Sequence, residues 1–172
     1  MKHSQKIACI LVWLAAAVAQ TAPSKGMTVV SEQRLKQLLP ATVFIDGENV
    51  PTQERNATLV QLPNGKLFLA SLIDTSGYSS AYQEKYSGVL LSQSGFTIGS
   101  KTFDAGAYAL GQKKGSDSVT LHVYNLGGEQ LAELQAERQS DLRPLKPLQV
   151  IVAGDGSARF YLGPYYVPLA GR

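Results

Sequence analysis

The sequence predicts a mainly β protein, either an antiparallel β-sandwich or a small barrel, with one or two short peripheral helices. Short apolar or alternating runs recur along the chain, and turn signals rich in glycine, asparagine and aspartate separate them. Helical patterns are confined to short segments. The 172 residues, 44% of them hydrophobic, fit one domain that can bury a core without disulfides or a metal.

The first 19 residues predict a cleavable secretory signal peptide. Lys2 and Lys6 give a positive start, residues 7–18 are an apolar run, and alanines at 17 and 19 fit a cleavage site. Twelve apolar residues are too few to span a bilayer, which needs about twenty. We therefore expect a secreted or periplasmic protein, with no membrane span after cleavage.

Cleavage changes what the composition implies. The chain has 16 Lys and Arg against 13 Asp and Glu, so losing Lys2 and Lys6 leaves 14 against 13 and lowers the net charge from +3 to +1. This small charge gives no case for a nucleic-acid partner. Cleavage also removes the only cysteine, Cys9, and the only tryptophan, Trp13. A cysteine-free secreted chain fits a bacterial envelope protein better than a disulfide-stabilised extracellular module.

The first part of the mature chain combines a leader, a helix and strands. Residues 20–30 are expected to form a flexible leader, and residues 31–172 a single β-rich domain. Residues 31–39 predict a short helix, because a serine fits its N-cap, leucines share one face and Pro40 ends it. Strands are expected at 42–45, 58–62 and 66–73. The last of these is apolar on both faces, which predicts a central, buried strand.

The remainder reads as strands around one further helix. Residues 79–86 predict a short helix inserted between strands. Residues 129–138 have high helix propensity but follow two glycines amid strands, so helix and strand both stay open there. Further strands are expected at 88–93, 96–98, 107–110, 118–126, 148–153, 158–162 and 165–169.

Gly99 to Tyr108 resembles a hairpin motif, G-x-x-x-[LF]-P-A-G-x-Y, seen in secreted bacterial β-domain proteins of unknown function. Residues 74–78, 125–128 and 161–169 are similar to the same group, so the resemblance covers most of residues 41–169. Asp104 stands where the motif has proline. The resemblance implies a β fold and export, and it brings no activity with it. Physically, Phe103 and Tyr108 are expected to pack across the turn.

The residues present exclude several chemistries. Without a mature cysteine there is no thiolate nucleophile or thiolate zinc site, and the lone His122 cannot make a two-histidine metal site. We expect no cofactor and no metal. His122 alternates with Leu121 and Val123, so it is expected to be an ordinary residue on the polar face of a strand. Turn formation explains the aspartates that neighbour glycine, serine or alanine, namely Asp46, Asp74, Asp104, Asp117 and Asp155.

Tyrosines are the one enriched chemical feature. Tyr78, Tyr82 and Tyr86 are spaced at i, i+4 and i+8, which places them on one stripe of a helix. We expect this stripe to pack on the sheet, with Tyr82 the most covered of the three. The alternative is a ligand-binding platform for a sugar, a peptide or an apolar molecule. A second tyrosine group lies near the C-terminus at 161, 165 and 166.

These observations favour a non-enzymatic binding or structural role in the bacterial envelope or outside the cell. The partner would be a protein, a peptide or a small molecule of the cell envelope. One alternative is a carrier of a small apolar ligand in a barrel cavity; another is a small hydrolase that uses carboxylates or His122. A filled core favours the first interpretation, a ligand-sized cavity the second and a cleft with two facing carboxylates the third.

The signal-peptide prediction has a direct test. The exported protein should begin at or near Gln20, because the small residues at 17 and 19 directly follow the apolar run. Mass spectrometry of the exported form measures this. Its fluorescence should show tyrosine emission alone, since Trp13 leaves with the signal. An exported protein that still begins at Met1 would contradict the assignment.

Overall fold

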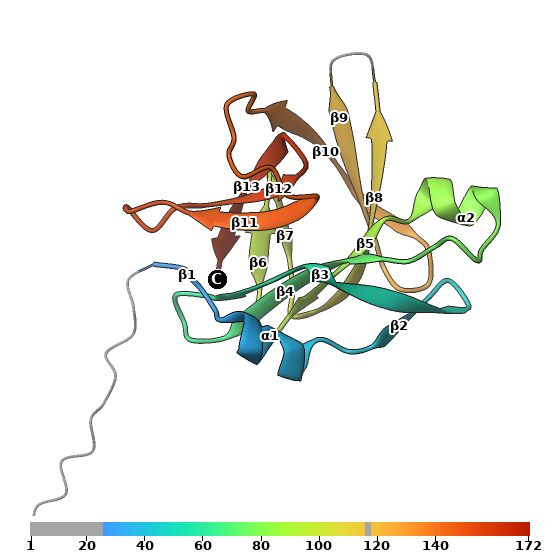
Figure 1. Cartoon of the computed structure of the whole chain (residues 1–172), viewed down its shortest axis with the longest axis horizontal. Coiled ribbons are helices and arrows are strands. Elements are labelled where there is room, and N and C mark those ends of the chain that lie inside the picture. The colour runs from blue at the N-terminus through green and yellow to red at the C-terminus, as the bar shows by residue number, and fades with distance from the viewer. Residues whose placement is uncertain (1–25, 116–117) are drawn as a thin grey trace, which may run out of the picture.

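The computed structural model describes residues 26–115 and 118–172. It confirms a mainly β fold, an antiparallel sheet nearly closed into a barrel with two short helices outside it (Figure 1). The helices are α1 (Glu32–Leu38) and α2 (Ser80–Lys85). The strands are β1 (Thr28–Val29), β2 (Thr42–Ile45), β3 (Glu48–Gln61), β4 (Leu67–Ile73), β5 (Gly88–Ser92), β6 (Phe96–Ile98), β7 (Lys101–Phe103), β8 (Gly106–Lys114), β9 (Val119–Tyr124), β10 (Gln130–Arg138), β11 (Leu148–Val152), β12 (Ala158–Leu162) and β13 (Tyr165–Gly171).

The strands follow one hydrogen-bonded path around the barrel. Its order is β1-β3-β4-β5-β8-β9-β10-β13-β12-β11, with β2 branching from β3 and the β6–β7 hairpin branching from β13. Most neighbours in this order are also neighbours along the chain. β1–β3 and β5–β8 skip one or two strands, and the longest step is made by β13, which pairs with β12 and also with β10 and β6 from earlier in the sequence.

The path has two ends, and they meet at a seam. β11 lies against β3 and β1 (Figure 1), yet no strand pairing joins them among the described residues. The start of the described chain crosses the β11–β12 turn closely, because a Cβ added to Gly26 would lie 2.9 Å from the Cα of Gly156. The barrel is therefore closed by packing at this seam.

Side chains fill the barrel interior. Three phenylalanines, Phe68, Phe96 and Phe160, are fully buried there, and the rings of the first two meet edge to face at 5.1 Å. Aliphatic residues from almost every strand complete the cluster, and Met27 joins it from the start of the chain. This packing accounts for the strong alternation of buried and exposed positions along the strands.

The outer face of the sheet is partly apolar too, and separate elements cover it. Leu35 of α1 packs on Leu59 and Leu69, while α2 and the β2–β3 hairpin cover a second outer cluster. As the sequence predicted, β4 is apolar and largely buried on both faces. The buried residues of this second cluster are Ile45, Val50, Ile73, Tyr82, Tyr86, Val89, Ala109 and Tyr124.

Several elements extend beyond what the sequence indicated. Residues 129–138, left open between helix and strand, form β10, because Ala132 and Leu134 point into the core with period two. β3 begins ten residues before the expected strand at 58–62, and β7 was not expected. The last part of the expected flexible leader belongs to the fold, since Met27 is buried and β1 pairs with β3. The signal segment lies outside the described residues.

No helix within the described ranges is long and apolar enough to cross a membrane.

Candidate functional site

The predicted tyrosine stripe forms a ladder of touching rings. Tyr78 stacks on Tyr82 at 5.1 Å between ring centroids, and Tyr82 contacts Tyr86 at 4.7 Å. The ladder continues onto β9, where Tyr124 meets Tyr86 at 5.4 Å. We call these four residues the tyrosine ladder. It fills the space between α2, the sheet and the β2–β3 hairpin.

Three of the four hydroxyl groups of the ladder, those of Tyr78, Tyr82 and Tyr86, donate hydrogen bonds to the β2–β3 hairpin. Tyr78 donates to the Asn49 carbonyl at 2.7 Å, and Tyr82 donates to the Ile45 carbonyl at 3.0 Å. Burial raises the pKa of Tyr82 to about 12. These bonds favour the packing interpretation of the stripe. The ligand-binding interpretation stays a prediction.

The expectation that Tyr82 is the most covered of the three is wrong. Tyr82 is 8% exposed and Tyr86 only 1%. Tyr86 lies just after the end of α2, where the chain turns toward β5, and its ring is enclosed by Tyr82 on one side and Tyr124 on another.

Asp46 anchors the ladder through Tyr86. Its carboxylate accepts a hydrogen bond from the Tyr86 hydroxyl at 2.8 Å, and it forms an ion pair with Lys85 Nζ at 3.2 Å. These two hydrogen bonds hold the pKa of Asp46 below its usual value, and the bond from Tyr86 has the larger effect. The Asp46 N–H donates to the Leu126 carbonyl at 2.8 Å. Asp46 thus joins the β2–β3 turn, α2 and the β9–β10 turn.

Two of the other aspartates confirm the turn-forming interpretation. Asp74 Oδ1 accepts from the Ser76 N–H at 3.0 Å, and Asp155 Oδ1 accepts from the Ser157 N–H at 2.9 Å. These serine hydrogen bonds lower the pKa of both carboxyls. Asp117 lies outside the described residues. Within the described ranges, no group of three or more acidic, histidine or cysteine side chains could hold a metal ion.

His122 lies on the outer face of β9, as the alternation predicted. Its Nδ1 is 3.1 Å from Gln130 Oε1, and its ring lies 6.2 Å from that of Tyr124. Its Nδ1 partner is thus an amide oxygen, whereas a carboxylate orients the base of a catalytic triad.

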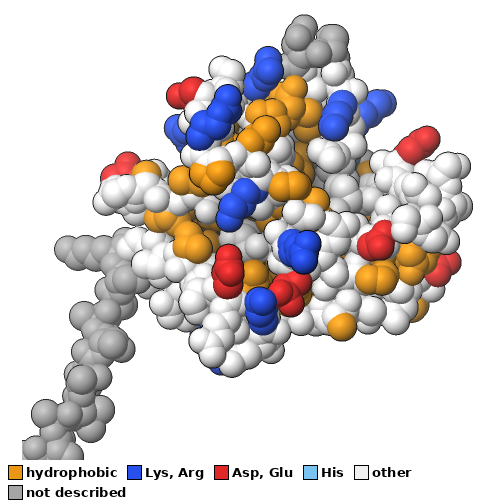
Figure 2. Space-filling view, viewed as in Figure 1, with side chains coloured by type: hydrophobic (Ala, Val, Ile, Leu, Met, Phe, Trp, Pro, Cys, Tyr) orange, Lys and Arg blue, Asp and Glu red, His pale blue; other side chains and the backbone are white. Residues whose placement is uncertain are grey.

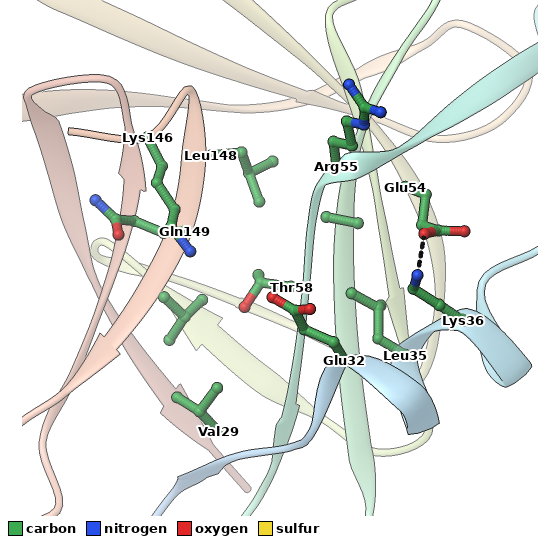
Figure 3. Close-up of a pocket in the computed structure, with 12 residues that line it drawn as sticks. Val29, Glu32, Leu35, Lys36, Glu54, Arg55, Thr58, Lys146, Leu148 and Gln149 are labelled. Carbon is green, nitrogen blue, oxygen red and sulfur yellow. Dashed lines mark ion pairs between the residues drawn. The ribbon is translucent and has the colours of Figure 1, made fainter. Parts of the chain in front are cut away.

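A pocket of about 350 Å³ opens at the barrel seam, between α1, β3 and β11 (Figure 3). We call it the seam pocket. Apolar side chains from four elements make its floor, and they belong to Val29, Leu35, Ala57, Leu148 and Val150. Polar and charged side chains surround them, and these are Glu32, Lys36, Glu54, Arg55, Thr58, Lys146 and Gln149.

Charges of opposite sign face each other across the seam pocket. Glu32 projects from α1 on one side, and Lys146 lies on the β11 side (Figure 3). Lys36 and Glu54 form an ion pair at 3.1 Å. Glu32, Arg55 and Lys146 have no ion pair within the described ranges. Figure 2 shows acidic, basic and hydrophobic side chains close together over this seam.

A bulge in β3 brings its charged residues to the seam. The strand pairing with β4 passes from Thr52↔Ile73 directly to Ala57↔Ser71, so residues 53–56 stand outside the register of this pairing. Gln53 Nε2 donates inward to the Ile73 carbonyl at 2.9 Å. Glu54 and Arg55 line the pocket instead. No sequence signal marked this site, because its charges come from distant positions without a motif.

Comparisons of the chain with protein-family models, with curated proteins and with solved structures found no match.

The ladder makes a stability prediction. Tyr82→Ala removes a buried ring and its bond to Ile45, so it should destabilise the fold by about 3–5 kcal/mol. Urea unfolding of the two proteins measures this. Phe44→Ala is the matched control, because the Phe44 ring is 62% exposed and its loss should cost about 0.5 kcal/mol. Equal midpoints for Tyr82→Ala and the wild type would contradict the packing role.

Asp46 makes a prediction about pH. Because its pKa is lowered in the folded state, its charge adds stability above the unfolded pKa, and that stability is lost as pH falls through the folded value. Asp46→Asn should therefore lower the urea midpoint near pH 7, and the difference from wild type should shrink below about pH 3. Asparagine tolerates the positive φ of this position, 51°.

The control for this measurement is Asp104→Asn, at an exposed carboxylate. It should leave the midpoint unchanged at both pH values. A loss of stability in Asp46→Asn that is the same at both pH values would contradict the assigned role of the charge.

Proposed function

We propose that this protein is an exported, non-enzymatic binding domain, and that its seam pocket takes a short peptide or a similar zwitterion of the cell envelope. One observation carries the proposal. Glu32 and Lys146, neither of them in an ion pair within the described residues, lie on opposite sides of one apolar floor, and Arg55 lines the same pocket.

The chemistry of the pocket fits the two ends of a peptide. A free ammonium group is attracted to the Glu32 carboxylate, and a free carboxylate is attracted to Lys146 and Arg55. Apolar side chains of the ligand would lie on Val29 and Leu148. The volume of about 350 Å³ falls at the lower end of the range of small-molecule sites, which is about 300–1,000 Å³.

Two further observations support binding over the alternatives. The barrel interior is filled with side chains, which speaks against a carrier that holds an apolar ligand inside it. Among the pocket's carboxylates, Glu54 is engaged with Lys36, which speaks against a free pair that could act as acid and base.

Export is part of the proposal. The signal-peptide pattern of residues 1–19 supports it, and so does the resemblance to secreted β-domain proteins. In the hairpin motif that carries the resemblance, the rings of Phe103 and Tyr108 pack at 5.2 Å.

The test compares a peptide whose two termini are free and charged with the same peptide whose termini are capped and neutral. Trialanine should bind the mature chain saturably in an NMR titration and should shift the resonances of Val29 and Leu35. N-acetyl-trialanine amide should bind at least tenfold more weakly, because a hydrogen bond to a charged group contributes about 1.5–3 kcal/mol.

Variants locate the site. Glu32→Gln and Lys146→Met should each weaken trialanine binding about tenfold or more. The control variants Glu84→Gln and Lys66→Met each remove one charge of the same sign outside the pocket, and they should leave trialanine binding unchanged. Equal binding of the capped peptide, no binding of trialanine, or full affinity in both pocket variants would overturn the proposal.

A further inference from the structure

A second concave region lies on another side of the barrel, between α2 and the β8–β9 hairpin. Its volume is about 700 Å³, and we call it the basic hollow. It shares no residue with the seam pocket. Its lining consists of Ala81, Gln83, Glu84, Lys85, Ser87, Gln112, Lys113, Lys114, His122 and Tyr124.

The hollow exists because the hairpin extends past the helix that covers its base. A Cβ on Gly111 would lie 2.2 Å from the Lys85 carbonyl oxygen, so the end of α2 rests directly on β8 at this glycine. Beyond Gly111, β8 continues to Lys114 and projects away from α2 (Figure 1). This leaves an uncovered surface between the two elements.

The lining carries an excess of positive charge. Among the described residues, the lining contains three lysines and one carboxylate, Glu84. Lys85 is paired with Asp46, but Lys113 and Lys114 have no ion pair within the described ranges. Figure 2 shows basic side chains gathered on the β8–β9 hairpin beside α2. Two further acids lie beside the lining, Asp46 in its ion pair with Lys85 and Glu133 opposite His122 in the β9–β10 pairing.

Flat rings and polar groups form the rest of the wall. The rings of His122 and Tyr124 lie 6.2 Å apart with planes inclined by 24°. Lys85 Nζ lies 5.4 Å from the Tyr124 centroid, which keeps a cation at the base of the hollow. Ser87, Gln83 and Gln112 add hydroxyl and amide groups.

We propose that the basic hollow binds an anionic sugar, whose carboxylate or phosphate group pairs with Lys113, which lies on the same face of the β8–β9 hairpin as His122, while Lys114 adds positive charge beside it. Lysines serve as point charges for such anions, while hydroxyl and amide side chains can bond sugar hydroxyls. The hollow is concave, and Ala81 and Tyr124 are the only apolar residues in the described part of its lining, so it suits a soluble ligand better than a membrane surface. This site does not depend on the proposed function of the seam pocket.

The experiment titrates the mature chain at low salt with three sugars, followed by NMR. Trigalacturonate carries carboxylates, glucose 6-phosphate carries a phosphate, and maltotriose is the uncharged control. At least one anionic sugar should bind saturably and shift the resonances of His122 and Tyr124, and its affinity should fall with added salt. Maltotriose should cause no saturable shift.

Paired variants assign the binding to the lysines. The double variant Lys113→Gln/Lys114→Gln should lose at least tenfold in affinity while keeping its melting temperature. The control double variant Lys66→Gln/Lys101→Gln removes the same charge elsewhere and should bind as wild type does. Trialanine binding should be the same in both double variants, which separates this site from the seam pocket.

Three results would overturn the inference. The first is unchanged affinity in Lys113→Gln/Lys114→Gln. The second is binding of maltotriose equal to that of the anionic sugars. The third is the absence of saturable binding of any of the three sugars. If the protein then sediments with phosphatidylglycerol vesicles, the partner of this surface is a membrane.

Discussion

Side chains on both faces of the central strands must be kept from water, and the placement of every peripheral element follows from this requirement. β4 is buried inside the barrel through Phe68 and Ala70, and its outer residues Leu69 and Ile73 also need cover. α1 covers the first of these and the β2–β3 hairpin with α2 covers the second. Both concave regions lie where this cover ends, one beside α1 at the seam and one beyond the end of α2.

Polar contacts at the β2–β3 turn hold the β2–β3 hairpin and α2 together. Asp46 adopts a positive φ of 51°, a conformation that costs free energy for a residue other than glycine. Its carboxylate is bonded to Tyr86 and Lys85, and a Cβ on Gly128 would come within 2.7 Å of its Cγ. The absence of a side chain at Gly128 therefore lets two turns, distant in sequence, pack against each other.

The sequence was most informative where local pattern and burial coincide. The strands at 58–62 and 66–73 were predicted because apolar residues and turn residues lie side by side in the chain. β10 shows the limit of this reasoning. Its residues favour a helix by propensity, but pairing with β9 and burial of Leu134 decide the outcome, and neither can be read from the propensity of the segment itself.

The candidate sites escaped sequence reasoning for the same physical reason. Glu32, Arg55 and Lys146 are scattered over more than a hundred positions, and only the meeting of α1, β3 and β11 brings them to one pocket. Asp46 was predicted as a turn residue, which is correct, but its bonds to α2 come from about forty residues further along. The tyrosine spacing was visible in the chain, whereas the acceptors of the hydroxyl groups were not.

The pairing of β13 has a consequence for how the polypeptide reaches this state. Most strands can pair with a neighbour as soon as the two have been made, since they follow one another along the chain. β13 is made last among the described strands, and it supplies the partner for β6, β10 and β12. Until it arrives, three strands present open edges to solvent, and open edges invite pairing with other chains. The interval before β13 docks is therefore when a newly made chain is most exposed to aggregation and to proteases.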